Sequence, residues 1–452
     1  MTFFRRVLGT FVTDIAMVGM NLLIGVLVAR AMSPSARGVL ALAMTMPLTI
    51  AYFIDPGIRQ ANIYLIGRRR RPVEIVAANS ITLALGIGLP AAFIIWLGQG
   101  PLLRTFLSGI TSSQLTLLLL LLPVLLLDGY MMAILRAWHQ FKRYNLRRLL
   151  AQILLLVLMF LMLVVLRKAA SGAILAFTLA MALSAVFSIV LVGRSTRLRP
   201  GFQPALAKEA VRYGLKSYAQ NLVGHLTYRL DLYLVAMFLE PAQIAFYAVA
   251  TSIAELAWYI PNSVGMVLFP RLSIATAEEI HPLTAEISRH TLFVTFLITL
   301  GLSVVGWIVI PLFYGEPYRA AIAPLLILLP GILVMAVYKV LTRNFSSRNR
   351  QQVSVLASAA ALLINVGLNV MLIPSLGIIG AAISSLAAYS IAGLILLIAF
   401  CRESGLPPHR VLFIRRDDLS RYGELIRQGP VWKDRLLGKK DVLGEVHAIG
   451  QE

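Results

Sequence analysis

The chain has 452 residues, of which 59% are hydrophobic and 13% are charged, and its mean hydropathy is +0.82. Ordinary soluble domains contain about 25% charged residues, so this composition indicates a polytopic membrane protein. The formal net charge of +21 does not indicate a nucleic-acid partner, because the basic residues lie in short clusters between apolar runs of about 20 residues. A single cysteine, Cys401, and six histidines without metal-ligand spacing leave no support for a disulfide framework, a bound metal or another cofactor.

The apolar runs predict an all-α membrane protein with about 12 transmembrane helices, since a bilayer core is crossed by about 20 helical residues. In chain order, the predicted spans lie near residues 9–31, 39–66, 74–97, 114–137, 149–166, 170–193, 212–238, 242–269, 289–314, 321–343, 352–373 and 377–400.

Basic residues gather in the connections on one side of these spans. They precede the first span and follow the second, fourth, sixth and tenth, whereas the opposite side has only Arg37, Arg104, Arg167, Lys168 and Arg319. Short cytoplasmic loops retain Lys and Arg, so we expect both termini to lie in the cytoplasm.

A weak internal repeat relates the two halves of the chain. A shift of 207 residues places Pro34 on Pro241 and Arg136 on Arg343. Because each half contains six predicted spans, an even number, both halves start on the same side of the membrane. We therefore predict two six-helix lobes related by a parallel repeat, with the axis along the membrane normal.

The repeat and the changes in composition predict four parts of the chain. These are an N-terminal lobe (1–193), a cytoplasmic linker between the lobes (194–212), a C-terminal lobe (213–400) and a charged cytoplasmic tail (401–452). The tail either lies on the anionic inner leaflet or is disordered, and its composition leaves both alternatives open. Its basic residues include Arg415, Arg416, Lys439 and Lys440.

Several ionisable residues lie inside predicted spans, where each costs about 2.5–3.5 kcal/mol or more. On the seventh span, Asn221, His225 and Arg229 recur every four residues and form one stripe, while Asp231 lies on a different face. Glu255 on the eighth span is placed to pair with Arg229. These groups either form a clamp that only holds the helices together, or line a cavity that binds an anionic group or a coupling ion.

The second predicted span contains a break, Asp55-Pro56-Gly57-Ile58-Arg59. A broken helix is tolerated at membrane depth where protein or a cavity satisfies the freed backbone groups, which indicates a functional site. Alternatively, Asp55 and Arg59 form an interfacial salt bridge at the cytoplasmic end of the span, close to Arg68.

No catalytic constellation is present in the sequence. It contains no Walker A motif or glycine-rich phosphate loop, and no extramembrane segment is large enough for a nucleotide-sugar transferase. We therefore expect a transport protein and not an enzyme, with energy supplied from elsewhere.

Four stretches carry a resemblance to a known family. They are the run from Tyr213 to Ser273, which begins YGLKSYAQNL, and the shorter stretches ARAMSPSARGVLALA, DPGIRQA and AWHQFKRYN. Over nearly all of residues 1–400 the chain resembles the polysaccharide transporter, or oligosaccharide flippase, family of the multidrug/oligosaccharidyl-lipid/polysaccharide superfamily. It departs from the family in having Met32-Ser33-Pro34 where Leu-Gly-Pro is more common.

The resemblance implies a flippase similar to O-antigen flippases, located in the bacterial inner membrane. Such a protein moves undecaprenyl-pyrophosphate-linked sugars across the membrane by alternating access of its two lobes, for polysaccharide biosynthesis. The cleft residues assigned to the pyrophosphate are Arg229, Arg59, Arg30, His225 and Asn221. The residues assigned to coupling with a proton or sodium ion are Asp231, Glu255 and Asp55.

The expected partners are the lipid-linked oligosaccharide, membrane lipids and the coupling ion, with a polysaccharide polymerase and glycosyltransferases as further candidates. Two other functions remain open. A cation-coupled multidrug antiporter shares the architecture, but its cavity should be net acidic, whereas Arg59, His225 and Arg229 favour an anion. A non-transporting membrane scaffold of a cell-envelope assembly would account for the charged tail.

Overall fold

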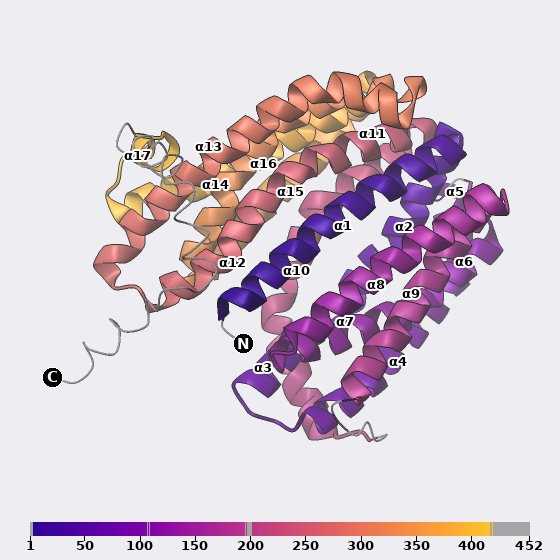
Figure 1. Cartoon of the computed structure of the whole chain (residues 1–452), viewed down its shortest axis with the longest axis horizontal. Helices are drawn as coiled ribbons and strands as arrows, with labels where there is room; N and C mark the ends of the chain where they lie inside the picture. Colours follow the sequence, from indigo (N-terminus) through magenta and orange to yellow (C-terminus); the bar gives the residue numbers. More distant parts are fainter. Residues whose placement is uncertain are drawn as a thin grey trace.

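The computed structural model describes residues 3–105, 107, 109–194, 196, 201–415 and 418, and every regular element within these ranges is a helix. The predicted all-α fold is therefore confirmed. Figure 1 shows the helices in two bundles, one formed by the first half of the chain and one by the second, with α1 (Phe3–Ala31) running diagonally between them.

The N-terminal bundle contains α1 and the helices that follow it as far as Gly193. In order, they are α2 (Pro34–Ile54), α3 (Ile58–Gly67), α4 (Val73–Leu97), α5 (Gln99–Thr105), α6 (Ser112–Leu119), α7 (Leu121–Ala137), α8 (Phe141–Phe160), the π-helical turn η1 (Leu161–Val165) and α9 (Ala170–Gly193).

The C-terminal bundle follows the same order of long helices. Its elements are α10 (Pro204–Phe238), α11 (Pro241–Ala254), the 3₁₀ turn η2 (Glu255–Trp258), α12 (Tyr259–Ile274), α13 (Ala277–Val309), the π-helical turn η3 (Ile310–Tyr314), the 3₁₀ turn η4 (Glu316–Ala321), α14 (Ile322–Ser347), α15 (Gln351–Leu376), α16 (Ile378–Ser404) and α17 (Pro408–Leu412).

The starts of α2 and α11 reflect the internal repeat. Each helix begins with a proline, Pro34 or Pro241, and proline suits this position because its missing N–H has no partner there in any case. Ser33 caps α2 by accepting a hydrogen bond from the backbone N–H of Ala36.

Among the described residues, eleven helices or helix pairs are long and apolar enough to cross a membrane. They coincide with every predicted span except the seventh, 212–238, which lies within α10. With 35 residues, α10 extends over about 50 Å, which is enough to cross a bilayer. Because α10 contains several polar and charged residues, its hydropathy is too low for it to be among these eleven.

The break predicted in the second span is present, and it separates α2 from α3. Gly57 has φ +85°, a conformation that suits glycine because it lacks a Cβ atom. The Oδ1 atom of Asp55 accepts hydrogen bonds from the backbone N–H groups of Gly57 and Ile58, at 3.1 and 2.9 Å. These bonds satisfy donors at the start of α3.

The linker and the tail are more helical than their composition predicts. Helix α10 begins at Pro204, inside the segment 194–212 that the sequence marks as a linker. After α16, the short helix α17 packs against α13 with Val411 fully buried, and Asp418 forms an ion pair with Arg289. Residues 419–452, including Lys439 and Lys440, lie outside the described residues.

Two acidic residues of the N-terminal spans are paired inside their own bundle. Asp14 on α1 forms an ion pair with Arg148 on α8 at 2.7 Å, and Asp128 on α7 pairs with Arg147 on α8. These pairs hold α8 against its neighbours, which fits a packing role for both carboxylates.

The two bundles meet along a seam that α2 and α3 form with α10 and α11. A Cβ atom placed on Gly38 would lie 1.7 Å from the carbonyl oxygen of Pro241, and one on Gly57 would lie 2.3 Å from that of Gly214. Near the second contact, the rings of Tyr64 and Tyr213 stack with centroids 3.9 Å apart. The seam is thus closed at the start of α2 and again at its end.

Candidate functional site: a basic cavity between the bundles

A cavity of about 490 Å³ lies between the two bundles, behind the seam. Helices α1 and α2 line it from the N-terminal bundle, and α10, α11, η2, α12 and η3 line it from the C-terminal bundle. Its polar and aromatic lining residues are Asn21, Arg37, Arg229, Ser252, Glu255, Trp258, Tyr259, Asn262 and Tyr314.

The predicted pairing of Arg229 with Glu255 is present in this cavity. Nη2 of Arg229 donates to Oε2 of Glu255 at 3.2 Å, and the two side chains are 40% and 24% exposed. Glu255 opens the 3₁₀ turn η2 that interrupts the eighth span between α11 and α12. Short 3₁₀ segments within long helices often mark hinges or strained sequence, and the pair lies at such a segment.

Arg37 is a second cation in the cavity, and its side chain lies against two aromatic rings. Its guanidinium carbon is 5.0 Å from the ring centroids of both Tyr314 and Tyr318, within the range of a cation–π interaction. Within the part of the chain that the structure describes, the buried Nη1 atom of Arg37 has no hydrogen-bond partner. A buried donor of this kind favours an incoming anion, because an unmade hydrogen bond is costly.

The charge of the cavity is therefore positive. Its described lining contains the two arginines Arg37 and Arg229 but a single carboxylate, Glu255. Guanidinium groups bind phosphate oxygens through two parallel N–H bonds, so the arrangement suits a phosphate or pyrophosphate group better than a cation.

Asp55 and Arg59 lie in the seam and do not line this cavity. Nε of Arg59 is 3.2 Å from Oδ2 of Asp55, an ion pair whose angle does not make a hydrogen bond. The hydroxyl of Tyr130 donates to Oδ1 of Asp55 at 3.2 Å. Asp55 is 7% exposed, so its carboxylate is buried within the protein at this ion pair.

His225 joins the same seam from the C-terminal bundle. Its ring stacks on Tyr52 with centroids 4.1 Å apart, and the guanidinium of Arg59 lies 5.1 Å from the centroid of Tyr52. His225 Nε2 also forms a hydrogen bond of 2.9 Å with the hydroxyl of Thr49. Tyr52 thus lies between Arg59 and His225, two residues predicted to bind the pyrophosphate, one from each bundle.

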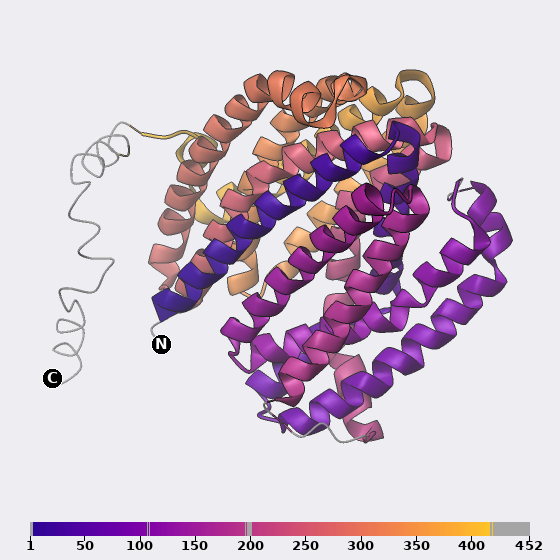
Figure 2. The same cartoon turned by 45° about the vertical axis from the view of Figure 1, so that its right-hand side comes forward.

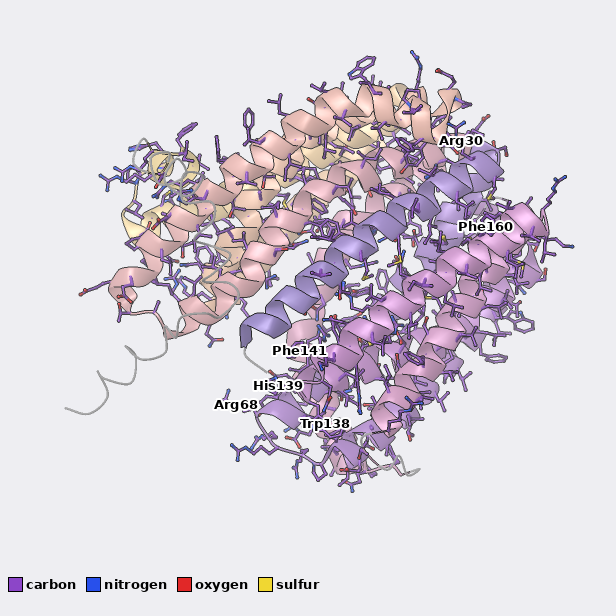
Figure 3. The ribbon with its side chains drawn as sticks, in the orientation of Figure 1. Arg30, Arg68, Trp138, His139, Phe141 and Phe160 are labelled. Carbon is purple, nitrogen blue, oxygen red and sulfur yellow. The ribbon has the colours of Figure 1, made fainter. Side chains whose placement is uncertain are left out.

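Arg30 and Asn221 lie apart from Arg229. Nε of Arg30 donates to the carbonyl of Phe313 at 2.8 Å, Nη2 donates to the carbonyl of Leu312, and its side chain lines a different pocket. In Figure 3, Arg30 lies at the opposite end of the molecule from Arg68. Asn221 is partly buried on α10, one turn before His225.

Asp231 lies inside the C-terminal bundle, 4% exposed, in a network of neutral hydrogen-bonding groups. Its Oδ2 accepts from the hydroxyls of Tyr247 at 2.5 Å and Ser385 at 3.2 Å. Asn365 donates to Ser385 at 3.4 Å, and Asn369 donates to Asn365 at 2.9 Å. The described residues provide no cation within ion-pairing distance of this carboxylate.

Sequence reasoning missed Arg37 and the partners of Asp231. In the sequence, Arg37 stands out only as one of five basic residues on the less basic side of the spans. Asn365 and Asn369 are four residues apart on an otherwise apolar helix, a spacing that could have marked a polar face of α15.

One group of side chains has the donor atoms of a metal site but a poor environment for a metal. Glu286, His290 and Asp418 bring one ligand atom each to within 4.8 Å of one another. Arg289 forms two hydrogen bonds with Asp418 and holds the pKa of this carboxyl well below its usual range. With Asp418 already neutralised by a guanidinium, a metal ion would have to displace Arg289.

Comparisons with known proteins identify the family of the chain. A family model described as polysaccharide biosynthesis protein matches residues 27–323. A protein of Haloferax volcanii named as the low-salt glycan biosynthesis flippase Agl15 is 21% identical over 202 residues, 44% of this chain and 42% of the relative's length. A protein of Shigella flexneri named as an O-antigen transporter is 21% identical over 370 residues, 79% of this chain and 87% of the relative.

Solved structures share the fold. A multidrug resistance MATE family transporter in an inward-facing conformation has a TM-score of 0.72 at 17% identity, over 86% of this chain and 94% of its own. The lipid II flippase MurJ, inward closed, has a TM-score of 0.68 at 15% identity, over 87% of this chain and 90% of its own. These likenesses support the predicted all-α membrane fold with helices in two lobes.

The curated relatives are named as a transporter and a flippase and not as enzymes. The family model covers about two thirds of the chain and agrees with the resemblance that the sequence carries. This multi-pass membrane protein belongs to the polysaccharide biosynthesis protein family.

Proposed function

We propose that this protein translocates a polyprenyl-pyrophosphate-linked oligosaccharide across the bacterial inner membrane by alternating access, in the biosynthesis of a polysaccharide such as a lipopolysaccharide. The observation that carries the proposal is the central cavity, in which Arg37 and Arg229 outnumber Glu255. The names of the curated relatives support the same class of cargo. The glycosyltransferases that make the substrate and the polymerase that uses it are the proposed pathway partners.

The pyrophosphate would bind in the cavity between the guanidinium groups of Arg229 and Arg37. Glu255 holds Arg229 in place while the cavity is empty, and a pyrophosphate would compete for the same N–H donors. The sugar would occupy the polar part of the cavity, while the polyprenyl chain stays in the bilayer, where its apolar surface is stable.

Alternating access requires the closed seam to open at one end at a time. Gly38 against Pro241 closes one end, and Gly57 against Gly214 closes the other. Arg59 and His225 lie beside the second contact, so opening there would expose both groups to a headgroup on its way to the cavity. In the predicted orientation, this is the cytoplasmic end.

Asp231 is the proposed coupling residue. A buried carboxylate without a counter-ion is costly, so a bound proton or sodium ion would stabilise it. The hydroxyls of Tyr247 and Ser385 and the amides of Asn365 and Asn369 provide neutral oxygen atoms nearby. Oxygen ligands suit a hard cation such as sodium, and a proton would serve the carboxylate equally well.

Reconstitution tests the proposal directly. Purified protein in liposomes should move a fluorescently labelled lipid-linked oligosaccharide between leaflets, and Arg229→Gln at equal protein density should reduce the rate at least tenfold. Transport of cationic drugs without movement of the labelled lipid would favour the antiporter.

A scaffold makes a different prediction. It would restore polysaccharide export to a flippase-deficient strain only through other proteins, and the purified protein would leave the labelled lipid where it was. Export that is restored equally well by Arg229→Gln and by the wild type would contradict the proposed site.

A further inference from the structure

A second pocket, of about 470 Å³, lies at the far end of α1 from the N-terminus. The last turn of α1, the π-helical turn η1 and the turn that leads into α9 line it. This pocket shares no lining residue with the central cavity. Three of its eight lining residues are cations, Arg30, Arg167 and Lys168, and none is acidic.

A tight turn after η1 brings Arg167 and Lys168 to the pocket that Arg30 lines. After η1, the backbone N–H of Lys168 bonds back to the carbonyl of Met162 at 2.8 Å, and Arg167 takes the left-handed conformation with φ +50°. A non-glycine residue in this conformation carries a conformational cost, which the surrounding structure must offset. The turn places Arg167 and Lys168 on the pocket that Arg30 lines from α1.

Arg30 is held in position by the other bundle. Its Nε and Nη2 atoms donate to the carbonyls of Phe313 and Leu312, which lie in η3. A guanidinium has five N–H donors, so these two bonds leave donors that can serve a ligand. Figure 3 places Arg30 and Phe160, the last residue of α8, toward the same end of the molecule, away from Arg68 and His139.

Among the described residues, no carboxylate lines the pocket. Within the described ranges, no carboxylate lies within 4 Å of the charged atoms of Arg30, Arg167 or Lys168. The other lining residues are Leu27, Ala31, Leu163, Val164 and Ala169. The pocket thus has a cationic part and an apolar wall.

Exposed apolar side chains flank the pocket. Val165 and Leu166, next to the two basic residues of the turn, are 58% and 50% exposed, as expected of side chains that face lipid. In the predicted orientation, this end of the spans carries few basic residues, yet Arg167 and Lys168 both lie on this one pocket.

We propose that this pocket binds the phosphodiester of an anionic phospholipid, with the phosphate between Arg30, Arg167 and Lys168 and an acyl chain along Leu27 and Val164. Charged groups and an apolar wall in one pocket match the two parts of such a lipid. Guanidinium and ammonium groups bind phosphate oxygens through charge-assisted hydrogen bonds. Because Arg30 is anchored to η3, the bound lipid would lie where the two bundles touch.

Native mass spectrometry of the purified full-length chain tests the proposal. After exchange into defined lipid, the wild type should retain phosphatidylglycerol at one site in preference to phosphatidylcholine. The double variant Arg167→Gln/Lys168→Gln should bind phosphatidylglycerol at least tenfold more weakly, because each basic group near the membrane surface contributes to the attraction. Both side chains are exposed, so the variant should unfold at the same temperature as the wild type.

A matched control and two competitors sharpen the test. Arg319→Gln removes a charge that Glu316 already neutralises, and it should leave lipid retention unchanged. A photoactivatable phosphatidylglycerol should label α1 and the turn between η1 and α9. The proposal is overturned if the double variant retains the lipid as well as the wild type does. It is also overturned if undecaprenyl pyrophosphate or the free glycerophosphate headgroup displaces the lipid at equal concentration.

Discussion

Arg229 and Glu255 form the charged pair on which the proposed transport cycle depends. Both side chains are partly exposed to the cavity, and ion pairs of this kind contribute about 0–1 kcal/mol to stability. Their effect should therefore appear in binding and transport and not in the unfolding temperature.

Neutralising the two residues one at a time should have opposite effects on substrate binding. Arg229→Gln removes a phosphate donor and should weaken binding of a lipid pyrophosphate at least tenfold. Glu255→Gln frees Arg229 from its carboxylate partner and should leave binding equal or tighter. Fluorescence titration in detergent measures both. Equal losses in the two variants would show that the pair is only structural.

Asp231 should control the ion dependence of transport. Asp231→Asn removes the charge of the carboxylate, and Ser385→Ala removes a hydroxyl that donates a hydrogen bond to it. Each variant should show a weaker dependence of lipid movement on a proton or sodium gradient. Ser384→Ala is the matched control, because that hydroxyl bonds to the carbonyl of Gly380 and not to Asp231. An unchanged gradient dependence in Asp231→Asn would remove this residue from the coupling mechanism.

At the scale of helices, the backbones of the two bundles approach closely where α2 crosses the start of α11. Glycine at position 38 lets the two backbones meet, since any side chain there would collide with the carbonyl of Pro241. Within the C-terminal bundle, the short helix α17 packs against α13, and an ion pair next to it connects the tail to α13.

Gly38→Ala should destabilise the contact between α2 and α11 by about 1–3 kcal/mol, the usual cost of overfilling a packed site. Gly19→Ala is the control, because its added methyl group meets no atom within 4 Å. The unfolding temperature in detergent should fall for the first variant alone. A normal unfolding temperature for Gly38→Ala would show that the bundles separate readily.

The attachment of the tail should persist in mild acid. Arg289 lowers the pKa of Asp418 in the folded protein. The ion pair therefore stabilises the folded state at every pH above the pKa of Asp418 in the unfolded chain. This stabilisation is lost only as the pH falls through the pKa of Asp418 in the folded protein. Protection of α17 from hydrogen exchange should therefore remain at pH 5. In Asp418→Asn, the protection of α17 should be lost at every pH. In Arg415→Gln, which changes an exposed side chain, the protection should remain.

At the scale of the whole molecule, the two bundles touch at both ends of the seam, with the basic cavity behind it. Figure 2, turned by 45° from Figure 1, again shows α1 in front between helices of the two halves. A transport cycle must separate the bundles at one end while the other stays closed.

Spin labels can follow the two ends separately. Labels at Ser35 and Glu240 report on the end near Gly38, and labels at Arg68 and Lys208 report on the other; all four side chains are exposed. In a Cys401→Ser background, addition of lipid-linked oligosaccharide should lengthen one distance and shorten or preserve the other. If both distances lengthen together, the bundles separate as a whole and alternating access fails.

Much of the architecture follows from local sequence. Runs of apolar residues predict the spans, and proline at positions 34 and 241 predicts two equivalent helix starts. The break at Asp55–Gly57 also follows from residue type, since proline and glycine interrupt a helix. These features depend on chain conformation and helix length, which neighbouring residues determine.

The distribution of the charged residues was decided by tertiary packing. Arg229 lines the central cavity with Arg37, while Arg59 and His225 lie in the seam, Arg30 in a separate pocket and Asp231 inside one bundle. A membrane helix that is apolar on all sides gives no amphipathic signal, so its rotation about its own axis depends on which neighbours it packs against. The sequence by itself determined that charges lie in the membrane, and only the tertiary structure decided which of them face one another.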